Sequence, residues 1–356
     1  MQIPVSERRN IPHHLLDVFE PENDFSAGEF YHLARAATED ILARGKTPIV
    51  VGGTGFYLRW YLLGKPSTPT SNKQTEALAQ QRIEQAWKEK GCAEGEGEGD
   101  EAKWAAGVAL VRELGDDESA DRLEGEFNNY YRLRRVVDIL MQAPGRTLKE
   151  LKLDEASQLP YDFRCYFLYR PRVELYRRID ARVEDMLGGG VLEETERELG
   201  QRGMKPNENC ATRAIGYRQA LDFLYSHTTS ISNAITTLDE SSIVDLAKAI
   251  QAASRRLCHS QLTWFRDDTL FRWIDATQGQ SSVVEEILGL WTEPCHEGGG
   301  EAFGAGRLSK EESHEMRRYV TKFEKLVKGS AYMDGVVQNA RSVVERMRAR
   351  ERETSS

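Results

Sequence analysis

The sequence is poor in the residues that build disulfide-stabilised, zinc-binding and membrane-spanning proteins. Its five cysteines, among 356 residues, form no Cys-x-x-Cys pair and no cysteine–histidine quartet. This argues against a disulfide scaffold or a structural zinc site and favours a reducing compartment. No run approaches the roughly 18 consecutive apolar residues of a membrane-spanning helix, and the first ten residues carry no secretory or organellar signal. We therefore expect a cytoplasmic protein outside the membrane, or a plastid or mitochondrial one if a transit peptide lies upstream.

What the chain contains is typical of a folded protein with more than one compact region. Hydrophobic residues make up 40% and charged residues 29% of the sequence, and the length favours two domains or one domain with an insertion. The formal net charge of -9 is unevenly distributed, because residues 90–126 carry 12 acidic and 4 basic side chains. The remainder is nearly neutral and has basic stretches, so the composition does not exclude RNA binding.

The first 65 residues show the pattern of a β-α-β unit. The apolar run His14–Phe19 and the β-branched run Pro48–Val51 predict two buried parallel strands. Between them, a capping box and a glycine stop predict a helix over residues 26–44. The second run leads directly into Gly52-Gly53-Thr54 and a further predicted helix over 55–63. The glycines would then lie at the carboxyl end of a parallel strand, where α/β proteins bind ligands.

The fold class expected from these patterns is α/β, with a truncated parallel sheet. Arg164–Tyr169 is the only other good strand candidate, so we expect an exposed apolar edge and low stability. Further helices are predicted at 171–187, 191–200, 211–225 and 240–264, the last with a seven-residue apolar stripe at Ile243, Ile250, Leu257 and Trp264. The expected regions are a partial α/β nucleotide- and diphosphate-binding core at 1–69, a helical insertion at 70–150, the rest of the core with a helical substrate region at 151–275, a linker at 276–306 and a charged helical tail at 307–356.

Two segments have the chemistry of a phosphate site. Gly52-Gly53-Thr54 offers backbone N–H groups at a helix start, unobstructed by Cβ atoms, with a hydroxyl among them. On the predicted helix 211–225, Arg218 could grip a diphosphate in a bidentate way, with Arg213 and Gln219 nearby. Each segment also fits a simpler reading: a tight strand-to-helix turn for the first, and solvated arginines on an amphipathic helix for the second.

Two other segments have the chemistry of an RNA contact. Arg132 and Arg135 are three residues apart on a predicted helix and would present two cations on one face. Gln261, Trp264 and Arg266 combine an amide, an aromatic ring and a cation, as nucleic-acid sites do. A solvated basic face and a core position for Trp264 explain the same residues without RNA.

Over about residues 1–275, the sequences of these motifs and their order resemble those of the tRNA dimethylallyltransferase family. The resemblance is strongest to its plant and algal members. The motifs are Pro12-His-His-Leu-Leu-Asp17, Ala43-Arg-Gly-Lys-Thr-Pro48, Val51-Gly-Gly-Thr-Gly-Phe-Tyr57, Arg132-Leu-Arg-Arg135, Ala214-Ile-Gly-Tyr-Arg-Gln219 and Gln261-Leu-Thr-Trp264. Several motifs in one unbroken order are far more specific than any one of them. The resemblance implies a P-loop-type α/β fold with a helical insertion that contacts tRNA.

The implied reaction transfers a dimethylallyl group from dimethylallyl diphosphate to N6 of an adenine next to the anticodon. By resemblance, Thr54 and Arg218 are catalytic and bind the diphosphate together with Gly52 and Gly53, so both side chains are expected to face one cavity. Mg²⁺ is expected to enter with the diphosphate, and the protein is expected to act as a monomer. The positions that correspond to tRNA-binding residues are Arg132, Arg135, Arg213, Gln219, Gln261 and Arg266.

The sequence departs from the family at its start. The family's phosphate-binding loop and the Asp-Ser motif that supplies its general base have no counterpart from Met1 onward. We therefore expect this chain to be inactive alone, with any protein ligands of Mg²⁺ in the absent segment. Two alternatives stay open: an adenylate isopentenyltransferase that makes cytokinin from free nucleotide, and a catalytically dead RNA-binding protein.

Overall fold

The computed structural model describes residues 5–65, 68–91, 98–153, 161–228, 238–266, 268–292 and 310–355. The chain divides into two compact units, a larger one formed by Met1–Leu58 with Tyr161–Ser356 and a smaller one formed by Arg59–Pro160. The smaller unit contains α3 (Lys73–Glu89), α4 (Glu98–Glu113), α5 (Asp117–Glu124), α6 (Tyr130–Gln142) and α7 (Leu148–Leu153). None of the described helices is long and apolar enough to cross a membrane.

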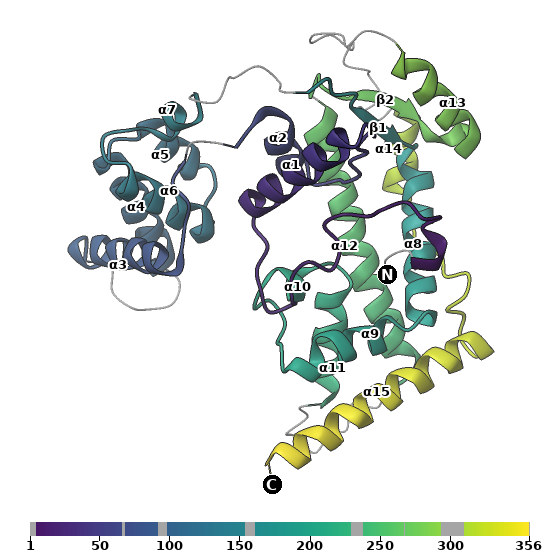
Figure 1. The fold of residues 1–356 in the computed structure, drawn as a ribbon. Coiled ribbons are helices and arrows are strands. Elements are labelled where there is room, and N and C mark those ends of the chain that lie inside the picture. The colour runs from purple at the N-terminus through teal and green to yellow at the C-terminus, as the bar shows by residue number, and fades with distance from the viewer. Residues whose placement is uncertain are drawn as a thin grey trace. The chain divides into compact units, whose positions relative to one another are not determined.

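The larger unit combines a two-stranded parallel sheet with many helices (Figure 1). Its elements are the 3-10 turns η1 (Val5–Glu7), η2 (Gly200–Arg202) and η3 (Ala276–Gln278), the strands β1 (Tyr166–Tyr169) and β2 (Arg272–Asp275), and the helices α1 (Ala27–Ala43), α2 (Gly55–Leu63, which continues into the smaller unit), α8 (Arg172–Gly188), α9 (Val191–Glu198), α10 (Cys210–Arg213), α11 (Tyr217–Thr228), α12 (Glu240–Arg266), α13 (Gln280–Trp291), α14 (Lys310–Arg317) and α15 (Ala331–Ser355).

The sheet pairs β1 with β2 in parallel, with Phe167 opposite Trp273. The strand predicted at 164–169 is confirmed by β1, whereas β2 has no counterpart among the strands predicted from the sequence. Trp273 packs with Phe265 of α12 against Phe167, whose ring centroid lies 4.4 Å from that of Trp273 and 4.9 Å from that of Phe265. This aromatic cluster fixes the sheet on the last turns of α12.

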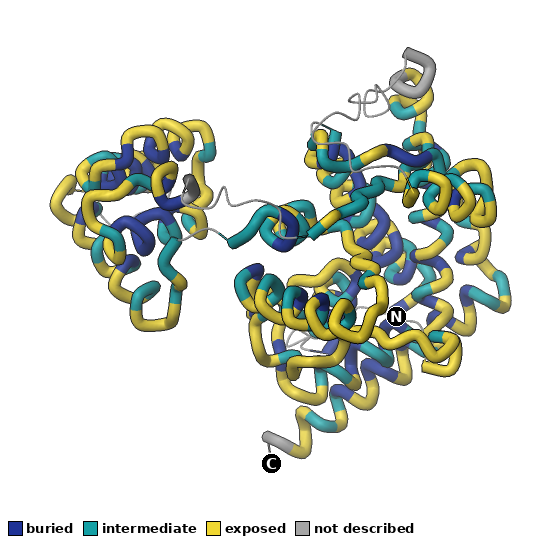
Figure 2. The backbone as a smooth tube through the Cα atoms, turned by 45° about the horizontal axis from the view of Figure 1, so that its top comes forward, coloured by how far each residue is buried: buried dark blue, intermediate teal, exposed yellow. Residues whose placement is uncertain are grey.

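The two strands predicted in the first 60 residues are wrong. Leu15 and Asp17 have φ values of 61° and 54°, in the left-handed region, which an extended strand cannot accommodate. Pro48–Val51 is not a strand either, because its backbone joins no described ladder, and Ile49 and Val51 are 83% and 91% exposed. The expected β-α-β unit therefore does not form, and the apolar residues of this segment are exposed without forming the sheet edge that the sequence predicts. Figure 2 colours the exposed parts of the backbone yellow.

Replacing Ile49 and Val51 by lysine is expected to reduce aggregation without unfolding the chain. Exposed apolar side chains promote association, while surface substitutions shift the free energy of unfolding by about 0.5 kcal/mol or less. Light scattering and urea unfolding would measure both effects. Ile274→Lys is the contrast, because Ile274 is fully buried in β2 and a lysine there is expected to cost about 3 kcal/mol or more. Equal destabilisation by both changes would show that Ile49 is buried.

The predicted helix at 26–44 is confirmed by α1 with its cap. The Ser26 hydroxyl accepts the Glu29 N–H at 3.2 Å, and the Glu29 carboxylate accepts the Ser26 N–H at 2.8 Å. Gly45 follows with a φ of 66°, which suits glycine beyond a helix end. These contacts span three residues, which is why the sequence predicts them.

Three other helix predictions need correction. The helix expected at 211–225 is two helices, α10 and α11, because Gly216 has a φ of 98° and breaks the turn between them. The linker expected at 276–306 contains α13, and its part from 293 onward lies outside the described residues. The apolar stripe of α12 holds only for Ile243 and Ile250, since Leu257 and Trp264 are nearly half exposed. A seven-residue spacing drifts by about 20° per repeat on a straight helix, so the stripe leaves the core.

The C-terminal helix α15 is part of the core of the larger unit. The expected charged tail is helical, but its apolar stripe is buried with residues of α8, α9, α11 and α12. The preceding segment is fixed by Glu184 of α8, whose carboxylate accepts the backbone N–H groups of Glu324, Lys325 and Leu326 at 2.7 to 3.1 Å. The buried residues of α15 are Met333, Val336, Val337, Ala340, Val343, Val344 and Met347.

The smaller unit has a separate apolar core built from α3 to α7. Asp116 caps α5 by accepting the Ser119 N–H at 3.0 Å, and its second oxygen accepts the Leu148 N–H at 2.9 Å. One buried carboxylate thus joins the starts of α5 and α7. Beyond these positions, the boundaries of the functional regions expected from the sequence stay a prediction.

Candidate functional site

The candidate site is built around the turn Gly52–Gly55 at the start of α2. The Thr54 carbonyl accepts the Leu58 N–H at 3.1 Å, so Thr54 takes the first cap position of the helix. Its side chain is exposed, and no described residue bonds its hydroxyl. From α12, Gln261 donates its amide N–H to the Gly53 carbonyl at 3.0 Å. The structure therefore brings Gln261 to Gly52–Thr54, which belong to another motif of the sequence.

The other side of α2 is held by the segment before α1. The Tyr57 hydroxyl donates to the Phe25 carbonyl at 3.1 Å, and the Tyr57 ring lies 5.4 Å from that of Phe30. The same Phe25 carbonyl accepts the Cys210 thiol of α10 at 3.9 Å. Residue 25 thus connects the turn of α2 with the start of α10. No sequence pattern indicates this link, because Tyr57 belongs to a motif but its acceptor is a backbone carbonyl 32 residues away.

Polar bonds join this segment to the start of α10. The Asn209 amide donates to the Pro21 carbonyl at 2.6 Å, and the Cys210 N–H donates to Asp24 at 2.7 Å. The hydrogen bonds from the Cys210 backbone and thiol lower the pKa of Asp24 below its ordinary value, with a smaller contribution from Arg213. Because the folded-state pKa is lowered, this contribution to stability is present above the unfolded-state pKa and is lost as the pH falls through the folded-state pKa. We therefore expect the bond between Asp24 and α10 to weaken in acid.

The three predicted residues around α11 have different surroundings. Arg213 is exposed and its Nε donates to the Asn207 carbonyl at 3.2 Å. Gln219 accepts the Gly216 N–H at 2.9 Å, so its amide oxygen closes the first turn of α11. Arg218 is half exposed and its Nε lies 3.9 Å from Asp222. Arg218 forms no hydrogen bond or ion pair with residues 52–55, all of which the structure describes, and the shared cavity expected for Arg218 and Thr54 stays a prediction.

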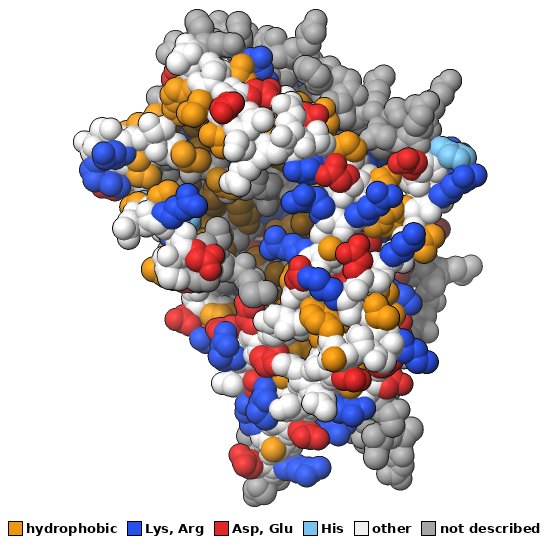
Figure 3. All heavy atoms as spheres, turned by 90° about the vertical axis from the view of Figure 1, so that its right-hand side faces the viewer, with side chains coloured by type: hydrophobic (Ala, Val, Ile, Leu, Met, Phe, Trp, Pro, Cys, Tyr) orange, Lys and Arg blue, Asp and Glu red, His pale blue; other side chains and the backbone are white. Residues whose placement is uncertain are grey.

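A cavity of about 660 Å³ lies in the larger unit between α8 and residues 314–324, away from the turn Gly52–Gly55. None of the predicted site residues lines it. Figure 3 shows Lys and Arg side chains interspersed with Asp and Glu on the face it draws, without a continuous patch of one charge. Within the described ranges, no group of three or more His, Cys, Asp and Glu side chains could hold a metal ion. Arg266 ends α12 and is half-buried.

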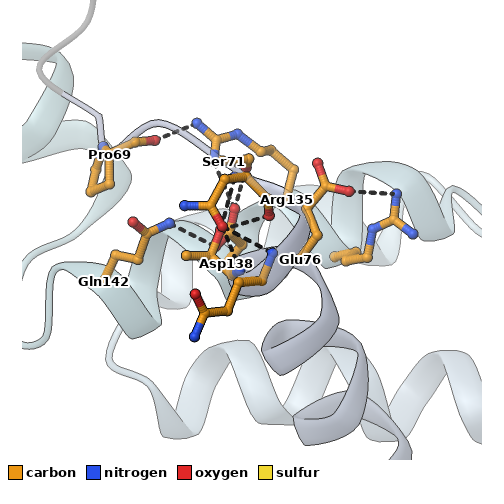
Figure 4. A network of polar contacts seen from close by, with 10 residues as sticks. Pro69, Ser71, Glu76, Arg135, Asp138 and Gln142 are labelled. Atoms are coloured by element: carbon orange, nitrogen blue, oxygen red, sulfur yellow. Dashed lines mark hydrogen bonds and ion pairs between the residues drawn. The ribbon is translucent and has the colours of Figure 1, made fainter. Parts of the chain in front are cut away.

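Arg132 and Arg135 lie on α6 of the smaller unit, and only Arg132 presents a largely exposed cation. Arg132 pairs with Glu126 at the surface. Arg135 donates to the Pro69 carbonyl at 2.6 Å, to Asp138 at 2.9 Å and to Ser71 (Figure 4). Asp138, whose side chain is 2% exposed, also accepts from Ser71 and Gln142. The guanidinium of Arg135 is therefore committed to a polar network that fixes residues 69–71 on α6.

Arg135→Ala is expected to destabilise the smaller unit by about 2 kcal/mol, because it removes the cation beside the buried carboxylate of Asp138. Arg132→Ala is the matched control and is expected to cost about 0.5 kcal/mol, as surface ion pairs do. Thermal unfolding followed by circular dichroism would compare them. If both variants unfolded at the temperature of the unchanged chain, the network would be irrelevant to stability.

Comparison with known proteins identifies the family. Residues 1–268 match the family model described as IPP transferase. The chain belongs to the IPP transferase family. The chain is 36% identical over 318 residues to tRNA dimethylallyltransferase 9 of Arabidopsis thaliana. The aligned region covers 79% of this chain and 63% of that protein. The chain is 32% identical over 282 residues to tRNA dimethylallyltransferase of Protochlamydia amoebophila (strain UWE25), covering 79% and 73%.

A solved structure shares the fold of this IPP transferase. A crystal structure of a eukaryotic dimethylallyltransferase acting on tRNA superposes with a TM-score of 0.59 at 20% identity, and it covers 92% of this chain and 76% of that one. The likeness supports the expected α/β class, which is confirmed although two of its predicted strands were misplaced. The resemblance read from the motifs is confirmed as well. The chain spans 63% of the length of the Arabidopsis relative.

Proposed function

We propose that this chain serves the transfer of a dimethylallyl group from dimethylallyl diphosphate to N6 of an adenine next to the anticodon of tRNA. Family membership supports the reaction class, since the two relatives compared above are named tRNA dimethylallyltransferases. The structural observation that carries the proposal is the exposed Gly-Gly-Thr-Gly turn at the start of α2, held on α12 by Gln261. Backbone N–H groups and a hydroxyl at a helix start suit diphosphate oxygens.

In the proposed reaction, the bond between the allylic carbon and the diphosphate oxygen breaks, and a bond from N6 to that carbon forms. Negative charge develops on the departing diphosphate and needs preorganised donors. Thr54 would donate its hydroxyl, the turn at Gly52 and Gly53 would offer room for close approach, and Arg218 would neutralise charge. N6 gives up a proton, and we assign no base to it among these residues.

Magnesium belongs to the proposal only as a companion of the diphosphate. It would offset diphosphate charge when bound. Within the described parts of the chain, no three or more Asp, Glu, His or Cys side chains lie close enough together to hold a magnesium ion. We derive no step from it, and the expectation that its protein ligands lie outside this sequence stays a prediction.

The proposed tRNA contacts are divided between the two units, and their side chains differ in exposure. Arg132 on α6 and Arg213 at the end of α10 carry exposed side chains. Arg135 and Gln219 are engaged within the protein, so they are weaker candidates. Arg266, half-buried at the end of α12, stays a proposed contact. Monomeric action and the cellular compartment likewise stay predictions.

Arg132→Ala is expected to weaken tRNA binding in a salt-dependent manner with turnover at saturating tRNA little changed. A phosphate contact releases counterions, so its loss lowers the slope of log K against log salt by about 0.9. Filter binding at several salt concentrations would measure the slope. Lys149→Ala removes another exposed, ion-paired cation of the smaller unit, on α7, and is the control. An unchanged slope in the Arg132 variant would remove it from the interface.

Transfer of labelled dimethylallyl to tRNA tests the function directly. The acceptors are a tRNA with adenine beside the anticodon, the same tRNA with guanine there, and free AMP. The proposal expects label only in the first. Preferential labelling of AMP would favour an adenylate isopentenyltransferase. Tight tRNA binding without transfer by the complete gene product would favour a catalytically dead RNA-binding protein.

A further inference from the structure

The amide of Gln261 occupies the space that a Cβ atom at position 53 would need, so only glycine fits there. A Cβ atom built on Gly53 would lie 2.2 Å from Nε2 of Gln261, and one built on Gly55 would lie 2.1 Å from Nε1 of Trp264. Real Cβ atoms do not approach heavy atoms so closely. Gly53 and Gly55 thus leave the space in which the side chains of Gln261 and Trp264 of α12 lie. The contact joins residues 208 positions apart in sequence.

The last turns of α12 are also anchored by apolar packing. A neighbouring face of the helix buries Cys258, Leu262 and Phe265 in the cluster that contains Trp273 of β2. Since Gln261 and Trp264 are on the same helix, their positions are set by that packing rather than by solvent. Because packing holds α12 in place, the hydrogen bond from Gln261 to the Gly53 carbonyl also holds the turn Gly52–Gly55.

The bond to Gly53 also sets the direction of the next N–H group. In a trans peptide, the carbonyl of one residue and the N–H of the following residue point in opposite directions. Because the Gly53 carbonyl points at Gln261, the Thr54 N–H points away from α12. None of the described residues accepts a hydrogen bond from this N–H. The same bond that holds the turn therefore aims a donor outward beside the Thr54 hydroxyl.

We propose that Gln261 is a positioning residue for the turn Gly52–Gly55 and does not read RNA. Its amide orients the Gly53–Thr54 peptide so that the Thr54 N–H and hydroxyl face one ligand, a diphosphate oxygen. Trp264 fills the space left by Gly55 and limits the tilt of the first turn of α2. This assignment rests on the proposed function for the identity of the ligand, whereas the lock between α12 and the turn stands on geometry alone.

Hydrogen exchange of the 356-residue chain tests the lock without any ligand. Gln261→Met keeps the length of the side chain and removes the donor. We expect amides of residues 58–61, which begin with the Leu58 N–H bonded to the Thr54 carbonyl, to exchange about fivefold faster, as the loss of one hydrogen bond predicts. His259→Met, on an exposed position of the same helix, should leave them unchanged. Gly53→Ala should displace the amide and give the same increase, and the double variant should add nothing, because both changes remove one contact. Unchanged exchange in Gln261→Met would overturn the lock.

Calorimetric binding of inorganic diphosphate and of tRNA then separates positioning from RNA reading. Positioning predicts that Gln261→Met weakens diphosphate binding about tenfold, leaves tRNA binding intact and, in the prenyl-transfer assay, raises KM for dimethylallyl diphosphate but not for tRNA. Weaker tRNA binding with unchanged diphosphate binding would overturn the proposal. If the unchanged chain fails to bind diphosphate while the exchange result holds, the lock is supported and the diphosphate assignment of the proposed function is wrong.

Discussion

Alanine in place of Thr54 or Arg218 is expected to lower turnover in tRNA prenylation by roughly 100-fold. Both groups would act on charge that develops as the carbon–oxygen bond breaks, and removing one donor to such charge typically costs two to three orders of magnitude. Because the interaction strengthens in the transition state, kcat should fall together with kcat/KM. Steady-state kinetics of the form that carries out the transfer, at saturating tRNA, would measure the loss.

Two conservative changes make this expectation specific. Thr54→Ser keeps the hydroxyl and should retain turnover within about threefold, whereas Arg218→Lys keeps the charge but loses the planar fork and should recover only part of it. Asp222→Ala removes the distant ion-pair partner of Arg218, 3.9 Å away, and should have little effect. If Arg218→Ala altered only the KM for tRNA, Arg218 would belong to the RNA interface and not to the diphosphate site.

The second large effect expected is strong destabilisation of the larger unit in Ala340→Glu. Ala340 is fully buried where α15 packs into the core of the larger unit. A glutamate there needs both space and solvation that the core does not supply, and we expect a destabilisation of about 3 kcal/mol or more. Domains of this kind are stable by only about 5–15 kcal/mol. Urea unfolding followed by tryptophan fluorescence would measure the change.

Gln338→Glu is the matched control for Ala340→Glu. It introduces the same side chain two residues earlier in α15, at an exposed position, and should change the free energy of unfolding by less than about 0.5 kcal/mol. Similar stability of the two variants would mean that α15 does not dock. The comparison matters because α15 lies beyond residues 1–268, the part that matches the family.

Local interactions explain what could be predicted from the sequence. The cap at Ser26, the stop at Gly45 and the strand at 166–169 each depend on neighbours within a few residues or on one apolar run. The motifs that identified the family are also local, because they are contiguous stretches of sequence. The family prediction was accordingly correct, and the helix predictions were correct apart from the break at Gly216, the helix α13 inside the expected linker and the apolar stripe of α12.

Predictions that required a distant partner were the ones that failed. Pro48–Val51 has the composition of a buried strand, yet a strand exists only where a neighbour supplies its hydrogen bonds. Arg135 and Arg132 have the same side chain on one helix, and contacts with Pro69 and Ser71, more than 60 positions away, show that Arg135 is internal.

The sequence by itself determined the family, the α/β class and most helix boundaries of this protein. The tertiary structure decided which strands pair, that α15 belongs to the core, and that Gln261 donates to Gly53. The physical reason is the range of the forces involved. Backbone capping and helical periodicity act over three or four residues and leave a pattern in the chain. Contacts between residues more than 100 positions apart leave none, since each partner is compatible with many others until the fold selects one.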